Sequence, residues 1–213
     1  MSNYMKLILA SQSPQKRSLL NKLGLVFQVE NPDIDEKVGK DENPESYVRR
    51  IALEKAEKIS KSNKDTLIIA HDMVIDLDGE IIGKPKDAKD AKKILKSLSG
   101  REHEVVSSAV LMLDGEAKYQ GAQRTTIKFR KLSAEDIEKY IKTEEWMEKA
   151  GAYAIQGEGG MLVESIEGSY FNIVGLPLTP LIRAFQKEGV EVDESVKQTI
   201  EMQEDSISGS FPR

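Results

Sequence analysis

The chain has 213 residues, which is long enough for one large α/β domain or for two closely joined lobes. Its 31 Lys and Arg residues face 36 Asp and Glu residues, and the net charge of −5 argues against nucleic acid as a partner. The chain contains no cysteine, which excludes disulfides, thiolate metal sites and a cysteine nucleophile and favours a cytoplasmic protein. No apolar run approaches the length of a membrane span, so we expect no membrane partner.

The first predicted unit is a strand followed by a turn and a helix. Residues 7–11 form a short apolar-to-small run typical of a buried strand, and the turn SQSPQK follows. Ser13 suits the helix N-cap, Pro14 the first helical position, and Gly24 the left-handed residue after the helix. The turn is therefore either a well-capped helix start or an anion site at a helix N-terminus, with Lys16 beside it.

The rest of the chain alternates predicted strands with predicted helices, a pattern that favours an α/β fold. Further helices are expected from Asn43 to about Ser60, from Asp87 to Gly100, from Ser133 through Ile141, and over LTPLIRAFQKEG. Further strands are expected in VFQVENPDIDE, from Leu67 to Ala70, on both sides of the Asp78-Gly79 turn, and in HEVVSSAVLML, TTIKF and MLVESI. We expect residues 1–189 to form one domain, followed by a polar, frayed extension over residues 190–213.

The second predicted helix carries a lysine on its apolar stripe. The stripe consists of Val48, Ile51, Ala52 and Ile59, and Lys55 occupies the helical position between them. A lysine at such a position either extends along its stem toward water, which is the more common outcome, or meets an anion inside the fold. Other charged groups at the same place would favour the anion.

Two polar residues follow the third predicted strand. His71 and Asp72 come directly after the apolar run Leu67 to Ala70, and ligands bind at the carboxyl ends of strands in open α/β sheets. Asp72 is either a turn aspartate or a functional carboxylate, and the apolar residues on both sides favour the second interpretation. His71 has no second histidine nearby and is therefore a poor signal for a metal site.

Glu36 and Lys84 complete a candidate set of carboxylates and lysines, although either residue alone would be an ordinary solvated loop charge. Carboxylate oxygens are the ligands that Mg²⁺ takes together with substrate phosphates, and lysines neutralise the charge that the metal leaves. Together with Asp72 and Lys55, the set points to phosphoryl or nucleotidyl hydrolysis. Composition does not choose the substrate.

Several separated segments of the chain match one family in order. LILASQSPQKRSLL, YVRRIALEKA, DGEIIGKPKD, LKSLSGREHEV and MEKAGAYAIQGEGG, followed by IEGSYFNIVGLPL, resemble the Maf-type nucleoside triphosphate pyrophosphatases, the septum-formation-inhibitor family. The resemblance covers most of residues 6–188, and separated segments in the correct order are far more specific than any single motif.

The resemblance implies both a fold and a reaction. The implied fold is related to that of inosine triphosphate pyrophosphatases: a long mixed sheet flanked by helices, with two lobes and a central cleft, often in a homodimer. The implied reaction is hydrolysis of a nucleoside triphosphate between the α- and β-phosphates, giving the monophosphate and pyrophosphate, with a divalent cation, Mg²⁺ or Mn²⁺. Such enzymes are thought to remove non-canonical or excess nucleotides.

The resemblance also implies which residues contact the triphosphate and carry out the chemistry. Asp72 falls on the acid of the family's GADT segment, the implied catalytic base. Glu36 matches an acidic position tied to catalysis and metal binding, so that Glu36 and Asp72 are the expected metal ligands. Lys55 and Lys84 match lysines that hold the phosphates, and such a phosphate would be the anion that Lys55 requires.

The turn SQSPQK resembles the family's Ser-x-Ser-Pro-Arg-Arg motif, with one important departure. Ser11, Ser13 and Lys16 would contact the triphosphate, but the arginine pair of the family is Gln15-Lys16 here. Lysine does not replace arginine in a bidentate phosphate contact, so phosphate binding should differ in strength or angle.

Three residues match the positions by which the family sorts bases: Gln15, Met73 and Gln156. Gln156 in AYAIQG is the pyrimidine-type glutamine, which favours UTP, dTTP or modified pyrimidine nucleotides, whereas Gln15 and Met73 depart from the usual arginine and threonine. The alternatives are a purine or 7-methylguanosine-type pyrophosphatase, and a catalytically weak nucleotide-binding regulator of septum formation.

Overall fold

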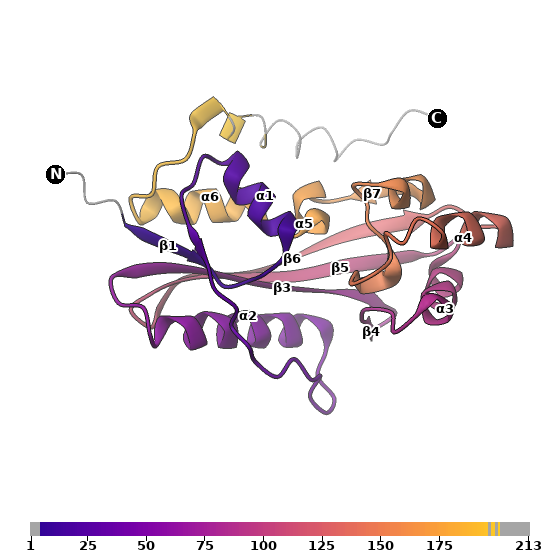
Figure 1. Ribbon diagram of the computed structural model, residues 1–213, viewed down its shortest axis with the longest axis horizontal. Helices are drawn as coiled ribbons and strands as arrows, with labels where there is room; N and C mark the ends of the chain where they lie inside the picture. The colour runs from indigo at the N-terminus through magenta and orange to yellow at the C-terminus, as the bar shows by residue number, and fades with distance from the viewer. Residues whose placement is uncertain (1–4, 196, 199, 201–213) are drawn as a thin grey trace.

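The computed structural model describes residues 5–195, 197–198 and 200 (Figure 1). Its centre is a seven-stranded sheet in the order β2-β1-β3-β5-β6-β7, with β4 paired to β3 beside this path. The strands are β1 (Lys6–Leu9), β2 (Gln28–Val29), β3 (Thr66–Leu77), β4 (Glu80–Ile82), β5 (Glu102–Leu113), β6 (Glu116–Phe129) and β7 (Val163–Glu167). β1 runs parallel to β2 and β3, and the other described strand pairs are antiparallel, so the sheet is mixed.

Helices cover both faces of this sheet. They are α1 (Pro14–Lys22), α2 (Pro44–Ser60), α3 (Ala88–Leu98), α4 (Ala134–Ile141), α5 (Tyr170–Val174) and α6 (Leu178–Lys187), with short 3-10 helices η1 (Ala150–Ala152) and η2 (Glu158–Leu162). In Figure 1, α2 lies under one face, whereas α1, α5 and α6 lie over the other. α3 and α4 lie at the end of the long strands away from β1. The predicted α/β class, a long mixed sheet flanked by helices, is confirmed.

The predicted helix starts are confirmed by their capping hydrogen bonds. In α1, α2, α3 and α4 the N-cap side chain accepts a hydrogen bond from the backbone N–H three residues later, which satisfies one of the free amides of the first turn. These N-caps are Ser13, Asn43, Asp87 and Ser133. Gly24 and Gly100 follow the ends of α1 and α3 with φ of +73° and +70°, the left-handed conformation that glycine adopts without strain.

The apolar core divides into two lobes that share the long strands. In the first lobe, Leu9 and Ile69 pack toward α1 and α6, whereas the alternating residue Ile8 packs toward α2. In the second lobe, Ile75 and Phe129 pack with the apolar faces of α3 and α4. Because β3 and β5 run through both lobes, a polar residue near the middle of β3 lies where the lobes meet.

The strand predicted from Leu67 to Ala70 is much longer in the structure. β3 continues to Leu77, so His71 and Asp72 lie within the strand, and the prediction that they follow its end is wrong. The parallel partner β1 ends opposite Ile69, whereas the antiparallel partner β5 continues to Asp76. Pairing with β5 keeps the polar residues of β3 within the strand. Asp72 therefore lies in the middle of β3, level with a point just beyond the end of the neighbouring strand β1.

Other differences concern short elements. The predicted strand VFQVENPDIDE contains only the two residues of β2, and Met161 belongs to η2 rather than to a strand. Helix α5 was not predicted, because a five-residue helix is too short to show an apolar period. Its start does carry a capping signal, since Ser169 accepts a hydrogen bond from the backbone N–H of Asn172.

The predicted extension over residues 190–213 lies mostly outside the described residues. Within the described part, Val190 and Val192 pack against the core of the first lobe, and Ile200 is buried in that core. The domain boundary at residue 189 stays a prediction. Among the described residues, no helix combines the length and the apolar character that crossing a bilayer requires.

Candidate active site

A cleft of about 620 Å³ lies between the two lobes. Its walls come from the β1–α1 turn, the loop before α2, the middle of β3, and the segments 83–84, 148–150, 153–156 and 173–175. The residues predicted for the site all line it: Ser11, Ser13, Gln15, Lys16, Glu36, Lys55, Asp72, Met73, Lys84 and Gln156. The structure thus brings together residues from six separate segments. Their individual chemical roles stay predictions.

The β1–α1 turn directs the start of α1 into the cleft. The backbone N–H of Ser13 donates to Ser11 Oγ at 3.2 Å, and Ser13 Oγ in turn donates to Gln15 Oε1 at 3.1 Å. These bonds hold both serine hydroxyls and the Gln15 amide along the wall of the cleft. The first amides of a helix and its dipole favour an anion at this position.

Lys16 extends from α1 over the middle of β3. Its Nζ donates to the carbonyl oxygen of His71 at 3.4 Å. Burial and repulsion from Lys55 lower the pKa of Lys16 to about 8, although Asp72 and Glu36 oppose the shift. Gly175 packs beside this side chain, and its φ of +138° is a conformation that residues with a side chain rarely adopt.

Lys55 on α2 forms two ion pairs inside the cleft. Its Nζ lies 2.6 Å from Asp72 Oδ1 and 2.7 Å from Glu36 Oε1, and the residue is only 7 % exposed. The lysine on the apolar stripe therefore meets anions inside the fold, and the interpretation in which it extends to water is wrong. Burial lowers the pKa of Lys55, but Asp72 and Glu36 outweigh burial, so the pKa stands above the ordinary lysine value.

Asp72 is a buried carboxylate with neighbouring lysines. Burial raises the pKa of Asp72 above the ordinary aspartate value, and attraction to Lys55 and Lys16 only partly opposes this. A raised pKa makes the carboxylate a stronger base than an exposed aspartate. Its position in β3, which has partners along its length, fixes the carboxylate relative to both lobes.

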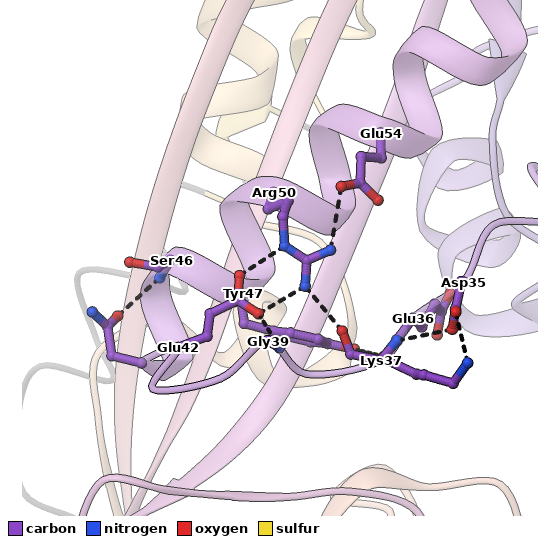
Figure 2. A network of polar contacts seen from close by, with 10 residues as sticks. Asp35, Glu36, Lys37, Gly39, Glu42, Ser46, Tyr47, Arg50 and Glu54 are labelled. Atoms are coloured by element: carbon purple, nitrogen blue, oxygen red, sulfur yellow. Dashed lines mark hydrogen bonds and ion pairs between the residues drawn. The ribbon is translucent and has the colours of Figure 1, made fainter.

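The loop that carries Glu36 is fastened to α2, as Figure 2 shows. The hydroxyl of Tyr47 donates to the carbonyl oxygen of Glu36 at 2.8 Å. Arg50 donates through Nε and Nη2 to both carboxylate oxygens of Glu42, each at 2.7 Å, and Nη2 also donates to the carbonyl oxygen of Lys37 at 3.0 Å. This bidentate contact lowers the pKa of Glu42 to about 2.

The second lobe contributes a lysine from the opposite side of the cleft. Lys84 Nζ lies 3.1 Å from Glu148 Oε2, and both side chains are largely exposed. The two loops that carry them are joined by a backbone bond in which Gly151 N–H donates to the carbonyl oxygen of Gly83 at 3.1 Å. An exposed ion pair of this kind is weak, so a phosphate can displace Glu148 from Lys84 at small energetic cost.

A wall of the cleft is formed by the segment 153–156, which two tyrosine hydroxyls hold from behind. The Tyr153 hydroxyl lies 2.9 Å from Nε2 of the buried His103, and the Tyr140 hydroxyl accepts from the backbone N–H of Ala154 at 3.0 Å. Burial lowers the pKa of His103 to about 4, so this imidazole is neutral near pH 7. Gln156 lies exposed at the end of the segment, where it faces the open cleft.

Sequence reasoning missed several residues that the cleft contains. Tyr47 lies four and eight positions before Ile51 and Lys55, so the helical period that identified the stripe could have included it. Tyr153 stands in the same AYAIQG segment as Gln156 but carries no charge to single it out. No local signal identified Glu148, because its role depends on a contact with a residue 64 positions away.

The carboxylates of the site fit a divalent cation that also binds substrate. Among the described residues, no group of three or more His, Asp or Glu side chains is placed to hold a metal by itself. Asp72 and Glu36 nevertheless converge, since one oxygen of each contacts the same Lys55 ammonium. One or two carboxylates completed by phosphate oxygens and water form the usual donor set for Mg²⁺.

Comparisons with known proteins agree with the family resemblance. The dTTP/UTP pyrophosphatase of Dictyoglomus thermophilum is 46 % identical over 178 residues, covering 83 % of this chain and 92 % of that protein. The dTTP/UTP pyrophosphatases of Caldanaerobacter subterraneus and Pyrococcus furiosus are 45 % and 42 % identical, covering 86 % and 85 % of this chain and 89 % and 94 % of their own lengths. Among solved structures, a HAM1 protein from Coxiella burnetii aligns with a TM-score of 0.42 at 14 % identity, covering 74 % of this chain and 91 % of that one. The model of the family described as Maf-like protein matches residues 6–188, and the chain belongs to this family.

Proposed function

We propose that the protein hydrolyses a pyrimidine nucleoside triphosphate, dTTP or UTP, to the monophosphate and pyrophosphate. The observation that carries the proposal is the convergence of Lys16, Lys55, Asp72 and Glu36 at one place in a cleft between two lobes. Three relatives, each more than 40 % identical, are named dTTP/UTP pyrophosphatase. The whole chain is acidic, so a substrate with several negative charges needs lysines gathered at one place. Lys16, Lys55 and Lys84 line this cleft.

The triphosphate binds between the two lobes in this proposal. The first amides of α1, the hydroxyls of Ser11 and Ser13, and Lys16 contact phosphate oxygens from the first lobe. Lys84 contacts them from the second lobe after leaving Glu148. Fixed cations and amide dipoles that face the phosphates stabilise the charge that develops in the transition state without further rearrangement.

Asp72 acts as the general base. It takes a proton from a water molecule while the water oxygen attacks the α-phosphorus, and the bond from that phosphorus to the bridging oxygen breaks. Pyrophosphate leaves with this oxygen, and the added hydroxyl oxygen stays on the monophosphate. The raised pKa of Asp72 supports the role, because a base works best when its pKa lies near the working pH.

Glu36 and Asp72 would hold a divalent cation, Mg²⁺ or Mn²⁺, together with phosphate oxygens. The cation would neutralise charge on the phosphates and on the leaving pyrophosphate. Lys55 now contacts both carboxylates, so in this proposal its ammonium shifts toward the phosphates when cation and substrate bind. A buried lysine with two anionic partners stays charged throughout, which suits it for this exchange.

The pyrimidine ring of the substrate lies against Met73 and Gln156 in this proposal, and Gln15 lies at the phosphate end of the nucleotide. Glutamine presents both a donor and an acceptor, which the edge of a pyrimidine can pair with. Gln15 is already engaged through its Oε1 by Ser13, which leaves its amide nitrogen for the substrate. The relatives' names support a pyrimidine, and Gln15 and Met73 are the residues that should set this chain's own preference.

A panel of nucleoside triphosphates with pyrophosphate detection, run with Mg²⁺ and with Mn²⁺, tests the proposal. We expect dTTP and UTP to be the best substrates, and Asp72→Asn to lower kcat by about 10²- to 10⁴-fold, the usual contribution of a general base. Asp76→Asn is the matched control, since Asp76 lies four residues further along β3 on the same face and pairs with Arg124 outside the cleft.

Two results would decide against the proposal. If a purine nucleotide were the preferred substrate, the proposed preference for pyrimidines would be wrong. Thermal stabilisation by nucleotides without pyrophosphate release under either metal would identify a nucleotide-binding regulator instead.

A further inference from the structure

Strand β5 carries two adjacent buried serines with different surroundings. Ser107 and Ser108 are both fully buried and point to opposite faces of the sheet. Ser107 Oγ donates to the side-chain oxygen of Asn172, which fixes α5 onto the sheet. Ser108 Oγ has no hydrogen-bond partner among the described residues. A buried hydroxyl without a partner is unfavourable and calls for an explanation, because alanine would fill the same position without the penalty.

Ser108 lies directly opposite Asp72 in the antiparallel ladder of β3 and β5. Residues paired in this way point to the same face of the sheet, and their Cβ atoms are about 4.5–5.5 Å apart. Both side chains therefore lie on the face that α2 covers, next to Lys55. At this separation, rotation of the two short side chains can bring Ser108 Oγ within hydrogen-bond distance of the carboxylate.

Asp72 has an oxygen available for such a bond. Its Oδ1 contacts Lys55, whereas Oδ2 forms no hydrogen bond with a described residue. The nearby Tyr47 hydroxyl already donates to the Glu36 carbonyl oxygen, so Ser108 is the neighbouring hydroxyl without another partner. If Lys55 moves toward the phosphates, Asp72 loses its donor while most of its side chain remains buried.

We propose that Ser108 is a positioning residue for Asp72: its hydroxyl donates to Asp72 when Lys55 moves to the substrate, and so keeps the base aimed at the attacking water. The inference rests on the proposed function. It explains why a hydroxyl without a partner is placed opposite this carboxylate, because Asp72 needs a replacement donor once Lys55 has moved to the substrate.

The decisive comparison is between Ser108→Ala and Ser60→Ala in the full chain. Ser60 is a matched control, since it is 3 % exposed, its Oγ also lacks a partner among the described residues, and it lies at the end of α2 outside the cleft. We expect both variants to have a melting temperature at or above that of the parent. Ser108→Ala alone should lower kcat about tenfold for the best nucleotide of the panel, with KM within about twofold, because a charge-assisted hydrogen bond is lost after binding.

Ser108→Thr keeps the hydroxyl and should restore most of kcat, whereas Ser108→Cys keeps the volume but donates poorly and should behave like Ser108→Ala. The cysteine variant serves as the second test if the alanine variant folds badly. A parent-like kcat in Ser108→Ala or Ser108→Cys would overturn the inference, as would a loss of kcat that only follows a loss of melting temperature. A parent chain without pyrophosphate release would overturn the proposed function itself, and the inference with it.

Discussion

At the scale of single residues, Lys55 determines the charge balance of the cluster that it forms with Asp72 and Glu36. One ammonium is shared by Asp72 and Glu36, and Asp72 also feels the charge of Lys16. Without this lysine, the two carboxylates would repel each other at such a short distance. A buried ion pair adds little net stability compared with an apolar pair, but removing one partner leaves a buried charge uncompensated. Lys55 therefore contributes to stability, whatever its part in the proposed reaction.

Lys55→Met should expose this dependence as a change of stability with pH. We expect a loss of about 3–5 kcal/mol in unfolding free energy near pH 8, because Asp72 remains buried without its cation. The folded-state pKa of Asp72 is raised, so protonation stabilises the folded chain as the pH falls, and the loss should shrink at pH 5.5. Denaturant unfolding of parent and variant at both pH values measures this. Lys58→Met, on the exposed side of the same helix, is the control, and an equal loss at both pH values would contradict the argument.

Lys16→Arg should change the alkaline limit of activity. Lysine holds a phosphate only while protonated, and the pKa of Lys16 in the free protein is about 8, so kcat/KM of the parent should fall as the pH rises through about 8. Arginine keeps its charge in this range, so the fall should move to higher pH in the variant. Profiles of kcat/KM from pH 7 to 9.5 test this, with Lys22→Arg in the exposed last turn of α1 as the control. If the profiles of parent and Lys16→Arg coincided, the fall of kcat/KM at high pH would belong to another titrating group.

At the scale of elements, the predictions from sequence succeeded where the signal is local. Ser13, Asn43 and Asp87 marked their helices correctly, because capping depends on a hydrogen bond three residues away. The length of β3 was not predictable in this way. Its residues past Ala70 are kept in the strand by pairing with β5, whereas the sequence pattern shows two apolar runs that His71 and Asp72 separate. Asp72 was therefore placed wrongly within its element, although it lines the cleft together with the other residues predicted for the site.

Helix α2 and its preceding loop act as one element, because Arg50 fastens the loop at Glu42 and at the Lys37 carbonyl oxygen (Figure 2). Arg50→Lys cannot reproduce the bidentate contact and should loosen the loop that presents Glu36. We expect kcat/KM to fall about tenfold or more, since small displacements of catalytic groups have large kinetic effects. The unfolding free energy should change by about 1 kcal/mol or less, because the contact is partly exposed.

Arg49→Lys provides the control for this experiment. Arg49 is the preceding residue on the same helix, and the ion pair that its side chain forms with a described residue is an exposed one with Glu45. The activity of Arg49→Lys should therefore stay near that of the parent. Steady-state kinetics on the three proteins, with unfolding curves in parallel, separates loop position from stability. Equal activities of Arg50→Lys and Arg49→Lys would show that the loop does not depend on this contact.

At the scale of the whole molecule, the site is a property of the two lobes together. Lys16, Lys55 and Asp72 are held by the first lobe and the long strands, whereas Lys84 and Gln156 come from the second. These residues were predicted from the sequence because they match motifs of the family that the chain resembles. The sequence could not predict which of them pair with one another, because the contact of Lys55 with Asp72 joins residues 17 positions apart on different elements. Pairing of this kind is decided by how the elements pack.

A polyanion that bridges the lobes should stabilise the whole fold. Pyrophosphate, the proposed product, at about 100 times its Kd adds about 2.7 kcal/mol to the unfolding free energy, which corresponds to a rise in Tm of roughly 5–10 °C for a chain of this size. Lys84→Gln removes the contact from the second lobe and should reduce the rise, whereas Lys86→Gln, beyond Pro85 and outside the cleft, should leave it intact. Thermal unfolding of the three proteins with and without pyrophosphate measures the difference. Because the attraction is between charges, the rise should also diminish at high salt. Equal rises in Lys84→Gln and the parent would mean that the anion binds to the first lobe alone.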